Sequence, residues 1–181
     1  MSERHKLSFS HVGVFVTDLE KMVDFYTRVL GLVVSDRAAT KEREIAFLTL
    51  DPREHHQVVF ASGRPADLAY NMIQQLSFRA ESLPALRDTY VALKREPIVE
   101  LGPISHGNAI SAYFRDPEGN RLEVFIDTKW HVPQPCAEPV DLMKPDAEIM
   151  DFVDRQVAGL PGAGLRSEWE RARMPNFSGA H

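Results

Sequence analysis

Apolar and polar residues alternate along residues 8–17, and a helical spacing of apolar residues follows directly. The alternation predicts a half-buried strand. Thr17 or Asp18 can then cap a helix, and Gly31 is well suited to end it. Three short β-rich runs complete the first part of the chain. The strand's apolar residues are Val12, Val14 and Val16, those of the helix are Met22, Val23, Phe25, Tyr26 and Leu30, and the later runs are 32–35, 45–50 and 57–61.

The same order of elements repeats in the second half of the chain. Residues 73–80 predict a strand, and Ser82 caps a helix that runs to Leu93. An Asp-Pro pair, which favours a chain reversal, begins the last turn of each half, at nearly equal offsets. The repeated order predicts an α+β fold of two paired βαβββ modules. The remaining predicted strands are 98–101, 109–115 and 121–126, and the Asp-Pro pairs are Asp51-Pro52 and Asp116-Pro117.

Composition changes divide the chain into a body and an arm. We expect one domain over residues 1–127, with modules at about 8–62 and 72–127 joined by a polar linker. Residues 128–181 form the arm, which we expect to pack on the body or on a second subunit. Within the arm, residues 130–135 predict a Pro-rich extended segment, 146–157 and 167–174 predict helices, and 175–181 are expected to fray.

Charge and cysteine content narrow the classes of function. The net charge is -5 and no basic stripe is present, which argues against nucleic acid as a partner. No run of 18 apolar residues predicts a membrane span, and residues 1–6 lack the apolar core of a signal peptide. Cys136 is the only cysteine, as suits a reducing compartment. We therefore expect a cytoplasmic enzyme or small-molecule binder.

Three polar residues occupy positions that the repeat makes equivalent or adjacent. His11 and Gln75 begin the first strands of the two modules, and Glu123 lies on a closing strand. An imidazole, a carboxylate and an amide oxygen can together hold a divalent metal and leave positions open for substrate. A single strand-end histidine or strand glutamate also suits an ordinary structural role. The spacing alone leaves both interpretations open.

The segments His11–Gly31 and Asp116–Glu123 resemble the opening and closing signatures of the vicinal-oxygen-chelate superfamily, which includes glyoxalases, bleomycin-resistance proteins and type I extradiol dioxygenases. Three further features resemble the catalytic module of the extradiol dioxygenases. They are Glu54-His55-His56-Gln57, Ser105-His106 through Ser111, and Tyr113 ten residues before Glu123. The resemblance spans about residues 8–127 and implies a glyoxalase-like fold.

The resemblance also implies roles for five residues. His11 and Glu123 would bind iron, and His56 would be the acid/base that handles the substrate proton. His106 would hydrogen-bond a substrate oxygen, and Tyr113 would donate to a bound hydroxyl. The implied reaction is extradiol cleavage of a catechol-type aromatic by O2, with Fe(II) as the metal and Mn(II), Ni(II) or Zn(II) as alternatives. Taken singly, each of these side chains also fits a turn, a loop or a packed strand.

Gln75 stands where the extradiol dioxygenases have a second histidine ligand. An amide oxygen is a weaker donor than imidazole for a late first-row metal, so iron should bind less tightly. Glyoxalases of the superfamily have a similar set of Gln, His and Glu ligands. The resemblance therefore allows a His11–Gln75–Glu123 site, a different metal, or no metal.

Two other functions compete with ring cleavage. A glyoxalase-like lyase or isomerase would need a second carboxylate near Gln57, where the sequence has His56 and Val58. A metal-free binding protein of the bleomycin-resistance type would need no ligand histidine. The presence of His11 argues against this type of protein. The two-module body and the Pro-rich arm are compatible with a homodimer.

Overall fold

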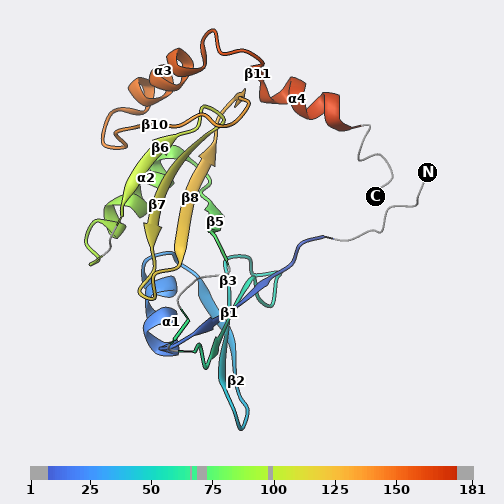
Figure 1. The fold of residues 1–181 in the computed structure, drawn as a ribbon, viewed down its shortest axis with the longest axis vertical. Helices are drawn as coiled ribbons and strands as arrows, with labels where there is room; N and C mark the ends of the chain where they lie inside the picture. Colours follow the sequence, from blue (N-terminus) through green and yellow to red (C-terminus); the bar gives the residue numbers. More distant parts are fainter. Residues whose placement is uncertain (1–7, 66, 69–72, 98–99, 175–181) are drawn as a thin grey trace, which may run out of the picture.

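The computed structural model describes residues 8–65, 67–68, 73–97 and 100–174. Two modules of strands lie end to end, and the C-terminal segment crosses the far end of the second (Figure 1). The expectations for residues 1–6 and 175–181, and for part of the strand at 98–101, lie outside the described residues. None of the helices in the described ranges is long and apolar enough to cross a membrane.

The first module contains one helix and a four-stranded sheet. Helix α1 (Leu19–Arg28) begins where the sequence predicts, because the Asp18 side chain accepts the backbone N–H of Lys21 at 3.0 Å. Its apolar stripe, including Phe25 and Tyr26, is buried against the sheet. The strand order is β1-β4-β3-β2, with β1 and β4 parallel and the other pairs antiparallel. The strands are β1 (Val12–Val16), β2 (Val33–Ala39), β3 (Glu44–Thr49) and β4 (Val58–Ser62).

The second module repeats this arrangement. Helix α2 (Leu83–Leu93) is capped by the Ser82 hydroxyl, and its buried leucines pack on one face of the sheet. The strand order is β10-β6-β7-β8-β5, with β5 and β8 parallel. The strands are β5 (Leu76–Arg79), β6 (Gly102–Ser105), β7 (Ala109–Arg115) and β8 (Arg121–Asp127), and β10 (Glu138–Pro139) is added from the arm. The observed modules are those of an α+β fold, as the repeat predicts.

Strand β6 lies later in the chain than the sequence predicts. The predicted strand ended at Leu101. Gly102 and Pro103 are residue types typical of turns, yet both lie inside β6. The outer neighbour of β6 is β10, which is only two residues long. Strand β6 is thus almost an edge strand, where a proline without an N–H is tolerated.

Contacts between α1 and the β7–β8 turn join the two modules. The Tyr26 hydroxyl donates to Asp116 Oδ2 at 3.1 Å, and the Phe25 and Phe114 ring centroids are 6.4 Å apart. Glu118 Oε1 accepts two backbone N–H groups that precede α1, each at 2.7 Å. We call these contacts the module junction. They fix the start of α1 against the second module.

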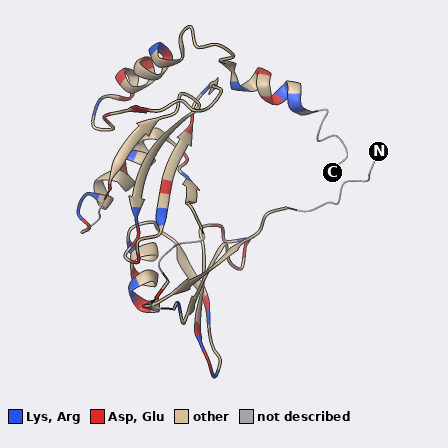
Figure 2. Ribbon diagram, in the orientation of Figure 1, with Lys and Arg blue, Asp and Glu red and all other residues tan. Residues whose placement is uncertain are grey.

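The arm packs mainly on the second module. Helix α3 (Asp146–Val157) buries Ile149, Val153 and Val157, and its Gln156 hydrogen-bonds Ser105 of β6 at 2.5 Å. Helix α4 (Arg166–Arg173) buries none of its residues and contacts the short strands β9 (Trp130–His131) and β11 (Gly164–Leu165). Charged residues of both signs lie along both modules and these helices (Figure 2).

Candidate functional site

The face of the second sheet opposite α2 carries a row of polar side chains. Residues alternate between the two faces of a strand, so cross-strand partners share a face. Glu123 of β8 is paired with Ser77 of β5 on one side and with Tyr113 of β7 on the other. Apolar neighbours such as Leu122 and Phe114 are buried on the α2 side. The three polar residues therefore form one row across three strands, which we call the polar row.

Gln75 and Ser77 hold the Glu123 carboxylate. Gln75 Nε2 and Ser77 Oγ each donate to Glu123 Oε2 at 2.7 Å, and Gln75 Nε2 also lies 2.7 Å from Ser77 Oγ. Glu123 is only 8% exposed. Since a buried carboxyl group is costly without partners, these donors offset the cost of burying it.

His106 connects Tyr113 of the polar row to the arm. His106 Nδ1 lies 2.7 Å from the Cys136 carbonyl oxygen, which can only accept a hydrogen bond, so Nδ1 carries the proton. In the neutral ring Nε2 is then an acceptor, and the Tyr113 hydroxyl donates to it at 2.8 Å. Burial, together with the nearby Glu123 carboxylate, raises the pKa of Tyr113 to about 12. Tyr113 thus keeps its proton at neutral pH.

His11 and His56 form a second cluster, on the first module. They precede the parallel strands β1 and β4, and their ring centroids are 4.3 Å apart. His55 Nδ1 lies 2.8 Å from His56 Nδ1. Desolvation, followed by the charges of His11 and His55, lowers the pKa of His56. The imidazole of His56 is therefore neutral, and able to accept a proton, near pH 7.

Two of the three predicted metal ligands are in direct contact in this structure. Gln75 contacts Glu123, whereas no hydrogen bond, ion pair or ring contact within the described ranges joins His11 to either. Those ranges also hold no group of three or more His, Cys, Asp or Glu side chains that could bind a metal. In addition, Gln75 turns its N–H groups, not its oxygen, toward Glu123. The Gln75 oxygen is thus not the atom turned to Glu123, and the His11–Gln75–Glu123 assignment stays a prediction.

Sequence reasoning missed three residues of this face. Ser77 binds Glu123, and the Ser111 hydroxyl is fully buried on β7 without a hydrogen-bond partner in the described structure. Arg121 of β8 places its guanidinium 4.6 Å from the centroid of the Tyr113 ring. Each lies two positions from a predicted site residue on the same strand or strand start. The period-2 alternation of polar residues was the signal that could have found them.

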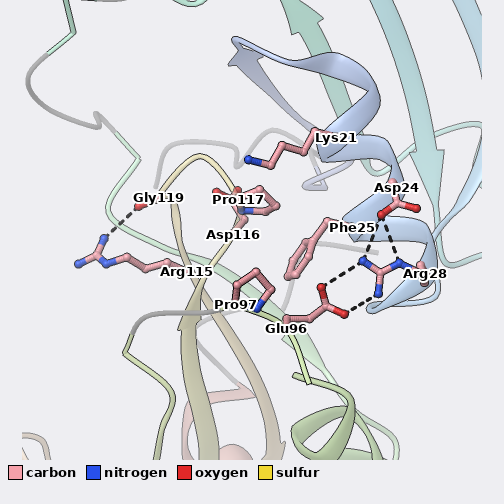
Figure 3. Close-up of a pocket in the computed structure, with 10 residues that line it drawn as sticks. All are labelled: Lys21, Asp24, Phe25, Arg28, Glu96, Pro97, Arg115, Asp116, Pro117 and Gly119. Carbon is pink, nitrogen blue, oxygen red and sulfur yellow. Dashed lines mark hydrogen bonds and ion pairs between the residues drawn. The ribbon is translucent and has the colours of Figure 1, made fainter. Parts of the chain in front are cut away.

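Two open cavities lie near these residues. A cavity of about 400 Å³ borders the polar row and is lined by Gly102, Ile104, Tyr113 and Arg121, among others. A second, of about 390 Å³, lies at the module junction beside Phe25 and Asp116 (Figure 3). None of the predicted site residues lines the second cavity, and its Arg28 is paired with both Asp24 and Glu96. Of these two cavities, only the one beside Tyr113 is lined by a predicted site residue.

Comparison with known sequences gives one family over most of this region. Residues 8–124 match the model of the Glyoxalase/Bleomycin resistance protein/Dioxygenase superfamily. Biphenyl-2,3-diol 1,2-dioxygenase 3 of Rhodococcus globerulus is 32% identical over 169 residues, which cover 86% of this chain and 85% of that protein. Biphenyl-2,3-diol 1,2-dioxygenase 2 of the same organism is 31% identical over 66% of this chain, and the match spans only 62% of its own length. Lactoylglutathione lyase of Escherichia coli O157:H7 is 25% identical over 63% of this chain and 88% of its own.

Solved structures share the fold. A glyoxylase/bleomycin resistance protein/dioxygenase domain from Frankia sp. EAN1pec superimposes with a TM-score of 0.60 at 24% identity, over 69% of this chain and 95% of that one. The fosfomycin resistance protein FosX from Listeria monocytogenes, solved with Mn(II) and sulfate, gives 0.54 at 18% identity over 67% and 93%. These likenesses confirm the predicted glyoxalase-like fold.

Proposed function

We propose that this chain, which belongs to the Glyoxalase/Bleomycin resistance protein/Dioxygenase superfamily, is a metal-dependent dioxygenase that opens the ring of a catechol-type aromatic. In such a reaction both atoms of O2 enter the product. The O–O bond and one ring C–C bond beside a hydroxyl-bearing carbon break, and no external reductant is consumed. The relatives named biphenyl-2,3-diol dioxygenases support this choice.

The observation that carries the proposal is the hydrogen bond between Tyr113 and His106 on the same face as Glu123. Ring opening requires proton donors and acceptors around the substrate oxygens. Tyr113, with its raised pKa, supplies a hydroxyl donor. The Cys136 carbonyl fixes the His106 tautomer, so its Nε2 can accept a proton. The pair can therefore exchange a proton with a bound oxygen without either group being ionised beforehand.

His56 is the proposed base for the catechol hydroxyl. Its lowered pKa leaves the imidazole neutral at pH 7, as proton acceptance requires. A divalent metal, with Fe(II) first and Mn(II), Ni(II) or Zn(II) as alternatives, would supply activation of O2 when bound. His11, Gln75 and Glu123 are the residues proposed to hold it.

The test is oxygen uptake by protein loaded anaerobically with Fe(II). With catechol or 2,3-dihydroxybiphenyl we expect one O2 consumed per substrate and a yellow ring-opened product. Tyr113→Phe keeps the ring but removes the donor to His106, so it should lower kcat by about 10- to 100-fold with unchanged iron content. If several catechols give no uptake while iron is confirmed in the protein, ring cleavage is excluded as the activity.

A glyoxalase-like lyase is the second candidate, and Gln75 is the residue that favours it. A glutamine at this position matches the Gln, His and Glu ligands that the superfamily's glyoxalases are expected to share. The lactoylglutathione lyase of Escherichia coli O157:H7 also matches over 88% of its length. Turnover of the methylglyoxal–glutathione hemithioacetal by the Ni(II)- or Zn(II)-loaded protein, with no oxygen uptake on catechols, would favour this candidate.

A further inference from the structure

Arg121 lies beside the polar row, at the start of β8. It begins β8, two residues before Glu123, and so lies on the same face of the sheet. Its guanidinium carbon is 4.6 Å from the centroid of the Tyr113 ring. Arg121 and Tyr113 both line the open cavity of about 400 Å³, together with Gly102 and Ile104. A molecule in this cavity would meet the guanidinium and the candidate catalytic tyrosine together.

The positive charge of Arg121 is not neutralised within the described part of the chain. Two arginines on the neighbouring strands β5 and β7 have carboxylate partners. Arg79 pairs with Asp127 at 2.9 Å. Arg115 pairs with Glu100 at 2.7 Å, at the rim of the same cavity. No carboxylate in the described ranges lies within ion-pair distance of Arg121, so the cavity carries an uncompensated cation in a protein of net charge -5.

Stacking on Tyr113 orients the Arg121 guanidinium so that it can bind a planar anion. A guanidinium is held over an aromatic ring by cation–π attraction, while its N–H donors point outward in its own plane. Two such donors match the two oxygens of a carboxylate in a bidentate pair, which is stronger than a neutral hydrogen bond. Arg121 is half-buried, and partial removal from water strengthens such a pair.

We propose that the substrate carries a carboxylate and that Arg121 binds it. The inference rests on the proposed function and narrows its substrate class. The substrate is then a catechol with a carboxylate on the ring or on a short side chain, not a neutral biphenyl-diol. Its hydroxyl end faces Tyr113 and His106, its carboxylate pairs with Arg121, and Ile104 contacts the ring.

The first experiment compares carboxylated and neutral catechols on the Fe(II)-loaded protein. We expect kcat/KM to be higher for a dihydroxybenzoate or a dihydroxyphenylpropionate than for catechol or 3-methylcatechol. Arg121→Gln should lower kcat/KM for the carboxylated substrates by about 10- to 100-fold, the usual effect of losing a hydrogen-bonded charge. The loss on neutral catechols should be smaller, so the ratio of kcat/KM values between carboxylated and neutral substrates should fall by about 10-fold or more. Arg121→Lys should restore only part of the loss, because lysine lacks the bidentate fork.

Arg79→Gln is the matched control. Arg79 also lies over an aromatic ring, at 5.3 Å from the Phe125 centroid, but its charge is neutralised by Asp127. The ratio of kcat/KM values between carboxylated and neutral substrates should be unchanged in this variant. If Arg79→Gln lowers the ratio as much as Arg121→Gln does, the preference arises from general charge and the proposal fails.

A binding measurement separates this proposal from ring cleavage itself. Benzoate and benzamide, which cannot be ring-opened, are titrated into wild type and Arg121→Gln, with circular dichroism to verify folding. Benzoate should bind wild type at least about 10-fold tighter than it binds the variant. Benzamide should bind the two proteins with equal affinity. If benzoate binds in this way but no catechol is turned over, the proposed ring-cleaving activity is rejected. The proposal that Arg121 binds a carboxylate is retained. Equal benzoate binding by the two proteins would overturn the role of Arg121, whatever the enzyme cleaves.

Discussion

Glu118, in the β7–β8 turn, accepts the backbone N–H of Thr17 at 2.7 Å, although 101 residues separate the two in the chain. The same carboxylate oxygen accepts the N–H of Asp18, at the start of α1. Arg64 pairs with the other carboxylate oxygen at 3.3 Å. A residue of the second module thus satisfies backbone donors where the helix of the first module begins, and an anion at a helix N-terminus is electrostatically favourable.

The first prediction concerns this contact. Glu118→Gln should lower the free energy of unfolding by about 1–3 kcal/mol, because the carboxylate is mostly buried and bonded to three donors. Urea denaturation measures the change. Glu42→Gln, at an exposed residue of the β2–β3 turn, is the control and should shift stability by less than about 0.5 kcal/mol. Equal effects of the two changes would show that the Glu118 contact does not hold the modules together.

The second prediction distinguishes His56 from its neighbour. His56→Ala should lower the rate of ring cleavage by about 100-fold or more, as expected for loss of a positioned proton acceptor, with metal content nearly unchanged. His55→Ala should have much less effect, since His55 faces Asp36 on the exposed side. Oxygen uptake and metal analysis are measured on the same preparations. Loss of metal in His56→Ala would make His56 a ligand instead.

The third prediction concerns Gln75. Gln75→His places an imidazole where an amide now lies 2.7 Å from Glu123. Imidazole binds Fe(II) more strongly than an amide oxygen, so iron retained after dialysis should rise. Gln75→Ala serves as the comparison and should not retain more iron than wild type. Unchanged iron content in Gln75→His would remove position 75 from the ligand set.

The fourth prediction uses Asp116, which is 5% exposed at the module junction. Burial raises its pKa above the ordinary value of 3.8, despite hydrogen bonds from Asn120, the Glu118 N–H and Tyr26. The folded state therefore binds this proton more tightly than the unfolded state. The resulting stability is fully present below pH 3.8 and is lost as pH rises through the folded pKa.

Asp116→Asn has no proton to exchange at this position. The free energy of unfolding of wild type minus that of Asp116→Asn should therefore fall as pH rises from about 3.8 and then become constant. Asp151→Asn, at an exposed residue of α3, controls for the loss of one charge and should show no such slope. A difference for Asp116→Asn that rises with pH would mean that its hydrogen bonds outweigh its burial.

Local patterns predicted most of the fold. Strand β7 and helix α3 match the predicted bounds 109–115 and 146–157, because their apolar spacing fixes both their type and their extent. Strand β6 was misplaced although Pro103 is tolerated there, because β6 lies almost at the sheet edge beside the two-residue β10. The rule that proline ends a strand is local, whereas the edge position that relaxes it is set by the tertiary structure.

The candidate site could be predicted only in part. The resemblance implied separate roles for His106 and Tyr113. In the structure the His106 Nε2 atom lies 2.8 Å from the Tyr113 hydroxyl oxygen. Ser77 could not be chosen without the β5–β8 register that sets it beside Glu123. How far His11 lies from Glu123 depends on the packing of one module on the other, which neither repeat encodes by itself.

The parallel pairing of β1 with β4 also sets the order in which the chain can fold during synthesis. In each module the first strand pairs with the fourth. Val12 therefore cannot pair until Val58 has been synthesised, and Leu76 cannot pair until Leu122 has been synthesised. Pairings between residues so distant in sequence are slow to form. The first module can close on the ribosome once β4 has emerged, but the start of α1 stays without its Glu118 acceptor until the β7–β8 turn has been translated. A nascent chain halted between these two points should therefore contain a closed first sheet with a frayed helix, and translation of the second turn should complete it.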